Sequence, residues 1–171
     1  MDLSLKLATN DQYTAIYSIM ALAGEHMHRA LGLSHWHPFP ASDYFINHLE
    51  GKEVFAVYEG NLLVGTFNIS TQPEPYYLAD MSAYWSRFDI ETMYFSAFAL
   101  LPSYQQRGVG SWCMMQMDQM VQERGFQQVR FDAVNTHSKL KGFYRKNGYH
   151  ERGILDLGRA QVMCFEKIFV S

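Results

Sequence analysis

The sequence predicts an α/β fold in a single domain over residues 1–171. Segments with the alternating apolar pattern of strands are interleaved with segments of helical spacing, rather than grouped apart from them. The expected element order is β-α-α-β-β-β-α-β-α-β-β. A length of 171 residues most simply makes one domain, and a hydrophobic fraction of 48% supplies a full core. The chain contains no internal repeat, low-complexity tract or linker.

The first part of the chain predicts one strand and two helices. Leucines alternate with polar residues over 3–7, as in a half-buried strand. Thr9 and Gln12 have the spacing of a capping box, which places a helix start there, and Gly32 is the expected terminator of that helix. Ser42 is expected to cap a second, short helix.

The middle of the chain predicts a hairpin, a long loop and a strand. The apolar runs Glu53–Tyr58 and Leu62–Ser70 are joined by the turn at 59–61, which favours a β-hairpin. Residues 71–91 contain two prolines and few periodic apolar positions, so we expect a loop of the kind that carries substrate contacts. Thr92–Leu101 is rich in strand formers and ends before a proline.

The last part alternates helices with strands. Val109–Arg124 has one apolar side and is followed by Gly125, so it predicts a helix with its terminator. Alternating apolar residues over 129–133 predict a strand, Ser138–Asn147 a helix, and Gln161–Val170 the final strand.

Composition excludes several classes of protein. The formal charge is −3, with 14 basic and 17 acidic residues, so the basic excess of nucleic-acid binders is missing and no nucleic-acid partner is expected. The N-terminus lacks the pattern of a signal peptide, and no apolar run approaches the roughly 18 residues of a membrane span. We therefore expect a cytoplasmic protein without a membrane partner. Its two cysteines fit no zinc spacing, and no metal is expected.

The junction between the predicted strand at 92–101 and the helix at 109–124 carries the main candidate site. Its sequence over Gln105–Gly110 is Gln-Gln-Arg-Gly-Val-Gly. Glycines let the backbone turn tightly and approach a ligand closely. The first helical turn adds unpaired N–H groups and the positive end of the helix dipole, which together suit a pyrophosphate. The lysine of a P-loop and the third glycine of a dinucleotide fold are absent.

This loop resembles the Gln/Arg-x-x-Gly-x-Gly/Ala loop of the Gcn5-related N-acetyltransferase (GNAT) family. Ala99–Pro102 just upstream is similar to the family's Ala-Val-x-Pro. Leu140–Tyr149 resembles its second signature, a helix that ends in aromatic-Tyr-x-x-x-Gly-aromatic. The two signatures stand in the family's order, separated by a helix and a strand, and their conjunction is far more specific than either one. The motifs cover about the last third of the chain, and the element order of the whole chain is similar too.

The resemblance implies a central mixed, mostly antiparallel sheet with splayed central strands, flanked by helices on both faces. It also implies acetyl-CoA as cosubstrate and direct attack of a primary amine on the acetyl group in a ternary complex. The amine would belong to a small molecule or a peptide, and fold analogy suggests a homodimer. One alternative is a catalytically inactive acyl-CoA-binding sensor or interaction domain. Another is a generic α/β domain whose glycine turn matches by chance.

By the same resemblance, backbone amides of the loop would bind the pyrophosphate, and the preceding strand would pair with the pantetheine arm. Members of the family commonly have Asn seven residues before the signature tyrosine, where this chain has His137, with Asn135 nearby. The implied donor-binding residues are Phe98, Ala99, Leu100, Gln105, Gln106, Arg107, Gly108, Val109, Gly110, Ser111, Asn135 and His137.

Tyr144 is the residue that the resemblance places near the sulfur of the donor. A phenol of pKa ~10 is a weaker acid than a thiol of pKa ~8.5, so we expect it to stabilise the leaving thiolate more than to protonate it. The alternative is a core tyrosine on an amphipathic helix. Cys113 lies on the apolar side of its predicted helix and is expected to be a core residue rather than a nucleophile.

The acceptor site is less defined. At pH 7, deprotonating an amine of pKa ~10.4 costs about 4.6 kcal/mol, so a base is needed, and Glu91, Asp132, His35 and His37 are candidates. The histidine-rich segment at 35–39 lies where family members shape the acceptor cleft; metal binding or plain loop packing are its alternatives. Aromatic segments at 76–77, 84–85 and 88 suit a cationic or aromatic amine. The acceptor-site candidates are His35, Trp36, His37, Tyr84, Trp85 and Glu91.

Overall fold

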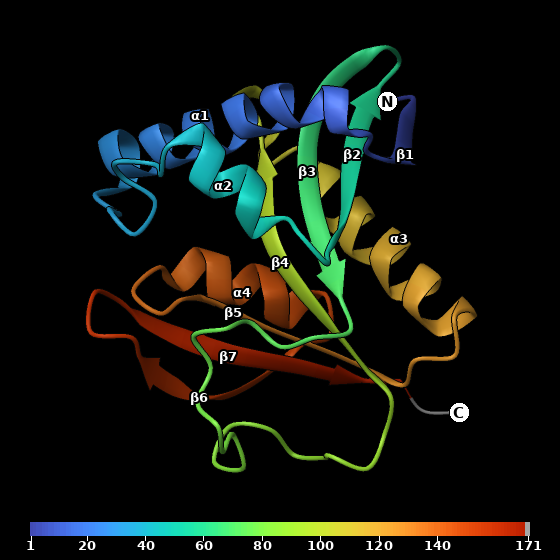
Figure 1. Ribbon diagram of the computed structural model, residues 1–171, viewed down its shortest axis with the longest axis vertical. Helices are drawn as coiled ribbons and strands as arrows, with labels where there is room; N and C mark the ends of the chain where they lie inside the picture. Colours follow the sequence, from blue (N-terminus) through green and yellow to red (C-terminus); the bar gives the residue numbers. More distant parts are fainter. Residues whose placement is uncertain (170–171) are drawn as a thin grey trace. The chain divides into compact units, whose positions relative to one another are not determined.

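The protein was analysed as a computed structural model, which describes residues 1–169. The chain divides into two compact units. The first unit comprises Met1–Ile69 and Ser96–Gly110, and the second comprises Ser70–Phe95 and the chain from Ser111 onward. Figure 1 shows the ribbon of the chain.

The order of helices and strands is the one that the sequence predicts. The strands are β1 (Leu3–Leu7), β2 (Glu53–Glu59), β3 (Leu62–Ser70), β4 (Thr92–Leu100), β5 (Gln128–Val134), β6 (His150–Asp156) and β7 (Gln161–Ile168). The helices are α1 (Tyr13–Leu31), α2 (Ser42–His48), α3 (Val109–Glu123) and α4 (Ser138–Lys146). Short 3₁₀ turns cover Asn10–Gln12 and Pro102–Tyr104.

The strands form a seven-stranded sheet in the order β1-β2-β3-β4-β5-β7-β6. The β4–β5 pair is parallel, whereas the β1–β2, β2–β3, β5–β7 and β6–β7 pairs are antiparallel. The parallel register covers only Thr92–Tyr94 of β4 and Gln128–Arg130 of β5, although both strands continue further. The predicted fold class is therefore confirmed: a mixed, mostly antiparallel sheet with splayed central strands, flanked by helices.

In the first unit, α1 and α2 pack against β2 and the second half of β4. The apolar stripe of α1 and the alternate residues Val54 and Ala56 of β2 share one buried cluster with Ala99. The remaining buried members of this cluster are Ile16, Ile19, Met20, Ala23, Phe45 and Leu49. Figure 1 shows α1 and α2 against this part of the sheet.

The predicted signals for the start and end of the first helix are confirmed, whereas the strand predicted to end at Tyr58 continues to Glu59. The Gln12 side chain accepts a hydrogen bond from the Thr9 backbone N–H at 2.9 Å, and α1 ends at Gly32, whose φ of 66° is left-handed. The prediction that Ser42 caps the second helix was wrong by one residue. Ser42 is the first residue of α2, and Ala41, which has no side-chain cap to offer, occupies the N-cap position.

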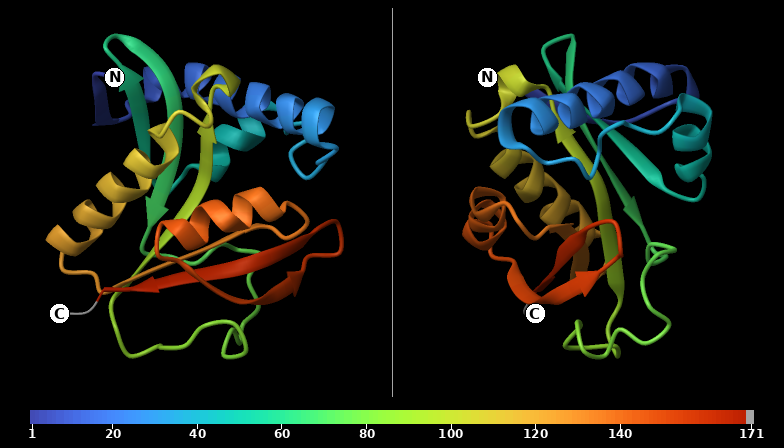
Figure 2. Two further views of the ribbon diagram at one scale, coloured as in Figure 1. Left: turned by 180° about the vertical axis from the view of Figure 1, so that it is seen from behind. Right: turned by 90° about the vertical axis from the view of Figure 1, so that its left-hand side faces the viewer.

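In the second unit, β5, β7 and β6 carry α4 on one face and the loop 71–91 on the other (Figure 2, right). Phe131 and Phe165 face α4, where their rings contact Tyr144. On the opposite face, Met81 and Trp85 of the loop are buried against residues of β6 and β7. The loop contains no helix or strand over 71–91, as predicted.

A buried ionic network ties this loop to the sheet. The Glu166 carboxylate on β7 is fully buried and accepts hydrogen bonds from the Gln128 side chain at 2.8 Å and from the backbone N–H of Ser86. Arg152 is 2.5 Å from the same carboxylate, and Arg130 is 3.9 Å from it. The loop is thus held in place by charge as well as by apolar packing.

Several predicted ends differ from the structure by one or two residues, which is the usual uncertainty where elements fray. The strand predicted to reach Leu101 ends at Leu100, and the helix predicted to reach Arg124 ends at Glu123. The predicted end of the last strand, Val170, lies outside the described residues. Within residues 1–169, no helix is long and apolar enough to cross a bilayer.

Candidate active site

The second half of β4 carries an unusual backbone conformation. Ala97 has a φ of 52°, in the left-handed region that non-glycine residues rarely adopt. Such outliers cost on the order of 1–3 kcal/mol and concentrate at functional sites. Next to it, the Phe98 ring meets Phe67 of β3 edge to face at 6.4 Å. The predicted donor-binding strand is therefore irregular at its centre.

A close approach between the backbones of β3 and β4 holds the C-terminal end of β4 in position. A Cβ at Gly65 would lie 2.9 Å from the Ala99 carbonyl oxygen and would overlap the Leu100 side chain. Only glycine fits at this position on β3. The Leu101 N–H then donates to the Val64 carbonyl oxygen at 2.8 Å, so the chain stays attached to β3 as it leaves the strand.

The predicted phosphate loop follows the 3₁₀ turn Pro102–Tyr104. Gln106 and Gly108 both have left-handed backbones, with φ of 58° and 85°, and both are exposed. When residues with left-handed backbones alternate with residues of right-handed backbone, successive N–H groups point toward one side and form a concave site for an anion. A Cβ at Gly108 would meet nothing within 4 Å, so this glycine is required for its dihedral angle rather than for space.

The side chains of this loop fold back on their own unit. The Gln105 side-chain amide donates to the Leu100 carbonyl oxygen at 3.3 Å. The Arg107 guanidinium donates to the Ser103 carbonyl oxygen at 3.3 Å and lies 5.1 Å from the centre of the Tyr104 ring. The loop thus combines side chains bonded to its own backbone with the exposed main chain of Gln106 and Gly108.

The other predicted donor contacts belong to the second unit and surround α4. His137 occupies the N-cap position of α4, where its Nδ1 accepts a hydrogen bond from the Leu140 N–H at 3.3 Å. The Asn135 side-chain oxygen accepts from Lys141 Nζ at 3.1 Å. Ser111, in the first turn of α3, is 3.4 Å from the Asn147 side-chain amide.

Tyr144 is buried on α4, with 6% of its surface exposed. Its ring lies 4.6 Å from Phe131 and 5.2 Å from Phe165, centroid to centroid. Burial, and then the negative charge of Asp132, raise the pKa of the phenol above its ordinary value, so it stays protonated in neutral and mildly alkaline solution. Its hydroxyl makes no hydrogen bond with any residue in the described part of the chain.

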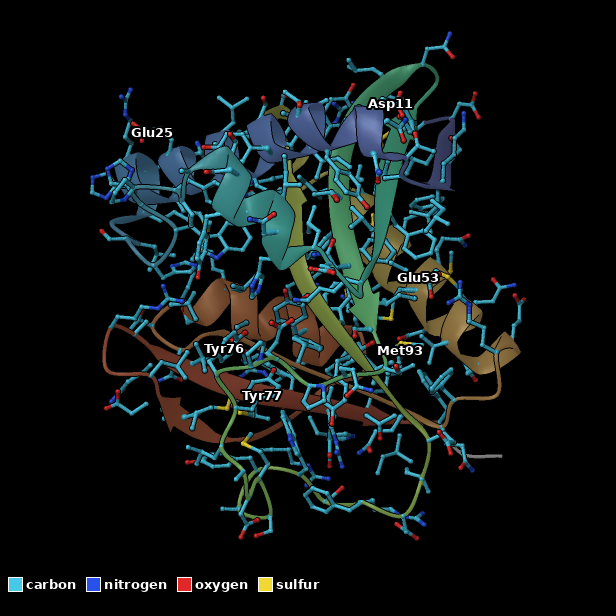
Figure 3. All side chains as sticks on the ribbon, in the orientation of Figure 1. Asp11, Glu25, Glu53, Tyr76, Tyr77 and Met93 are labelled. Atoms are coloured by element: carbon cyan, nitrogen blue, oxygen red, sulfur yellow. The ribbon has the colours of Figure 1, made fainter. Side chains whose placement is uncertain are left out.

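Three acceptor candidates, His35, Trp36 and His37, connect α1 to α2 in the first unit. Trp36 packs against the same core cluster as the second half of β4, and a Cβ at Gly24 would lie 2.5 Å from its carbonyl oxygen. His37 Nδ1 is 3.0 Å from a carboxylate oxygen of Glu25, which Figure 3 labels near the end of α1. The His37 ring also stacks on His28 at 3.9 Å.

The remaining acceptor candidates lie in the second unit. Trp85 is only 4% exposed and packs in the core under β6 and β7, with the Arg130 guanidinium 5.3 Å from its ring. The Tyr84 ring lies against Gly153. Glu91 is exposed and precedes β4, at the opposite end of that strand from Leu100. The structure therefore does not bring these three side chains into one cluster.

The sequence analysis named Asp132 as a candidate base and 76–77 as an aromatic segment, but it did not predict that these residues form a cluster. The hydroxyls of Tyr76 and Tyr77 both donate to Oδ2 of Asp132, each at 2.8 Å. The two tyrosines belong to the loop 71–91, and Asp132 lies on the face of β5 that this loop covers. The adjacent aromatic residues and the isolated acidic residue in an apolar strand were visible in the sequence, but nothing there indicated that they meet. Among residues 1–169, no group of three or more His, Cys, Asp or Glu is placed to hold a metal ion.

Solved structures of GNAT acetyltransferases share this fold. One from Streptococcus agalactiae has a TM-score of 0.78 at 17% identity, over 99% of this chain and 96% of that chain. The PaiA N-acetyltransferase of Thermoplasma acidophilum, in complex with coenzyme A, has a TM-score of 0.73 at 12% identity, over 99% and 100% of the two chains. A GNAT acetyltransferase from Elizabethkingia anophelis with acetyl-CoA bound has a TM-score of 0.71 at 11% identity, over 98% and 99%.

None of the curated proteins matches the chain. The model of the acetyltransferase (GNAT) family matches residues 14–149, a range that takes in residues of both units and more than half of the chain. This range contains both sequence signatures, the loop at 105–110 and the helix that carries Tyr144. The chain belongs to the acetyltransferase (GNAT) family.

Proposed function

We propose that this protein is an N-acetyltransferase that moves an acetyl group from acetyl-CoA to a primary amine by direct attack in a ternary complex. The observation that carries the proposal is the exposed loop after β4, where Gln106 and Gly108 adopt left-handed backbones directly before α3. Because one family model spans both units, we propose that they act together as one catalytic domain over residues 1–171.

Acetyl-CoA fits the chemistry of this loop. Its pyrophosphate needs several N–H donors at once, and left-handed turns before a helix supply them without charged side chains. In the proposal, the amides of 107–111 bind the pyrophosphate, and Phe98–Leu100 pair with the pantetheine arm. Asn135 and His137 are proposed as further contacts to that arm; since His137 Nδ1 already caps α4, its Nε2 is the atom left for this role.

Tyr144 is the proposed residue at the sulfur. Its hydroxyl is protonated and has no hydrogen-bond partner in the described chain, which suits a donor that waits for a leaving thiolate. A thiolate that receives a hydrogen bond leaves at lower cost, because negative charge accumulates on sulfur in the transition state. The raised pKa makes full proton transfer from the phenol unfavourable, so stabilisation is the proposed role.

The amine is proposed to belong to a small molecule or a peptide. Both cysteines are buried, and burial raises the pKa of Cys113 and of Cys164 to about 12. A thiol with such a pKa is almost entirely protonated near neutral pH and makes a poor nucleophile. This supports direct transfer from donor to amine rather than an acyl-enzyme.

The test combines binding with turnover. Isothermal calorimetry with acetyl-CoA, CoA and desulfo-CoA measures donor binding, and a thiol-release assay over a panel of primary amines measures transfer. Micromolar donor binding with thiol release for one class of amine is the expected result. Binding without release across the panel would indicate an acyl-CoA-binding sensor instead. Absence of donor binding would end the proposal.

A further inference from the structure

Two tyrosines converge on one carboxylate in the second unit. Tyr76 and Tyr77 each donate a hydrogen bond to the same oxygen, Oδ2, of Asp132 at 2.8 Å. Figure 3 labels both tyrosines on the loop 71–91. We call these three residues the tyrosine–aspartate cluster. Nothing in the donor-binding role proposed above uses them, although Asp132 belongs to a strand of the central sheet.

The cluster is held rigidly. The Tyr77 ring packs against Trp85 at 5.8 Å, Tyr94 at 6.4 Å and Tyr76 at 5.1 Å. Trp85 is itself buried in the core beneath β6 and β7, and the backbone N–H of the following residue is bound to Glu166. A loop without helix or strand is thereby fixed closely enough to orient a carboxylate, which is what catalysis by a positioned group requires.

The hydrogen bonds run from the phenols to the carboxylate. Loss of water around the hydroxyls, and then the negative charge of Asp132, raise the pKa of both Tyr76 and Tyr77 above the ordinary value. Both phenols therefore remain protonated donors at neutral and mildly alkaline pH. Two such donors on one oxygen hold the Asp132 carboxylate in a defined orientation.

The cluster and Tyr144 lie on opposite faces of β5, since Asp132 directly follows Phe131, whose ring packs on Tyr144. The Asp132 carboxylate is still near enough for its charge to contribute to the raised pKa of Tyr144. On β5, Asp132 lies two residues beyond Arg130, where the pairing with β4 ends. Tyr76 is the most exposed member of the cluster, with 39% of its surface accessible.

We propose that Asp132 is the catalytic proton acceptor for the amine nitrogen and that Tyr76 and Tyr77 are positioning residues that hold its carboxylate in place. This inference rests on the proposed function. It selects one base among four sequence candidates, because Asp132 is the one for which the structure supplies two dedicated donors.

In the proposed step, the electron pair and the proton each have a defined destination. The nitrogen lone pair forms the C–N bond at the thioester carbonyl, and the C–S bond breaks with its electron pair leaving on sulfur. The nitrogen becomes positively charged as the bond forms, and its N–H proton passes to the Asp132 carboxylate, which later releases it to solvent. The departing thiolate accepts a hydrogen bond from Tyr144 and gains a proton from solvent. Charge thus develops beside a fixed anion.

The test compares Asp132→Asn with the wild-type enzyme and with Asp89→Asn. Asp89 belongs to the loop 71–91, which also carries Tyr76 and Tyr77, but it pairs with Arg87 in solvent, so its variant serves as the control. We expect Asp132→Asn to lower kcat by about 10²–10⁴-fold, with the Kd for acetyl-CoA unchanged by calorimetry. Tyr76→Phe and Tyr77→Phe are expected to lower kcat several-fold. A kcat of Asp132→Asn within about twofold of wild type would overturn the proposal.

Chemical rescue separates a base from a structural residue. In Asp132→Ala, added formate can occupy the vacated space and accept the proton, so the rate should rise with formate concentration; the rate of Asp89→Ala should not. A folded, inactive Asp132→Ala that formate does not rescue contradicts the role as base.

If the Asp132 variants do not fold, Tyr76→Phe is the deciding variant, because Tyr76 is the most exposed member of the cluster and its loss of a hydroxyl should not prevent folding. A wild-type kcat in Tyr76→Phe overturns the proposal. If the wild-type enzyme releases no thiol with any amine, the proposed function itself has failed.

Discussion

The ring of Tyr144 lies 4.6 Å from the ring of Phe131, inclined at 57°, and 5.2 Å from that of Phe165. These contacts belong to the ring alone, whereas the hydroxyl has no partner in the described part of the chain. The ring of Tyr144 therefore makes the packing contacts, whereas the hydroxyl is the group proposed to act in catalysis. A substitution that removes only the hydroxyl can separate the two roles.

Tyr144→Phe keeps the ring and removes the hydroxyl. We expect the free energy of unfolding to change by less than about 1 kcal/mol, because no hydrogen bond within the described chain is lost. Turnover should fall by roughly tenfold to a thousandfold if the hydroxyl stabilises the thiolate. Thiol release at saturating substrates measures this loss. Wild-type kcat in this variant would leave Tyr144 as a core residue only.

The loop before α3 offers a matched pair of substitutions. Gly108→Ala puts a side chain on a backbone with φ of 85°, which costs roughly 1–2 kcal/mol. We expect the Kd for acetyl-CoA to rise about five- to tenfold. Gln106→Gly keeps the left-handed backbone and should bind within about twofold of wild type. Calorimetry on both variants decides, and equal affinities would mean that the loop conformation does not set donor binding.

The ionic network around Glu166 predicts a large loss of stability. Glu166→Gln removes a fully buried charge and leaves Arg130, itself nearly buried, without its counter-ion. We expect urea unfolding to show a loss of about 3 kcal/mol. The control is Glu151→Gln, which breaks a partly exposed pair with Arg145 and should cost about 0–1 kcal/mol. Similar losses in the two variants would contradict the importance of burial here.

Cysteine reactivity follows from the raised thiol pKa values. Burial raises the pKa of Cys113 and Cys164 to about 12, so at pH 8 both are almost entirely protonated, and the thiolate fraction grows only as the pH approaches that value. Iodoacetamide at pH 8 should modify neither residue in the native protein and both in urea. Mass spectrometry of the protein mixed with acetyl-CoA should show no acetyl-enzyme. Rapid native labelling of Cys113 would contradict this account.

Much of the fold could be predicted because periodicity and capping are local. The α1 boundaries follow from Thr9, Gln12 and Gly32, and the hairpin follows from two apolar runs around a short turn. The same holds for the loop at 105–110, whose glycines indicated a backbone turn before the structure showed one at Gly108.

Other features depend on contacts between segments distant in sequence. The left-handed backbone of Ala97 has no signal in its residue type, and the glycine at 65 is explained only by the approach of Leu100. The meeting of Tyr76 with Asp132 joins residues 56 positions apart. Trp85 was a candidate for the acceptor site because it is aromatic, whereas its burial follows from the packing of the whole loop.

The main-chain character of the loop at 105–110 bears on how such proteins diverge. A ligand held by backbone amides depends on the dihedral angles of the turn more than on the side chains outside its glycines. Gln106 is an instance, since it adopts a left-handed conformation without being glycine. A fold that presents such a turn can persist where little sequence does, as the solved structures at 11–17% identity illustrate for the fold.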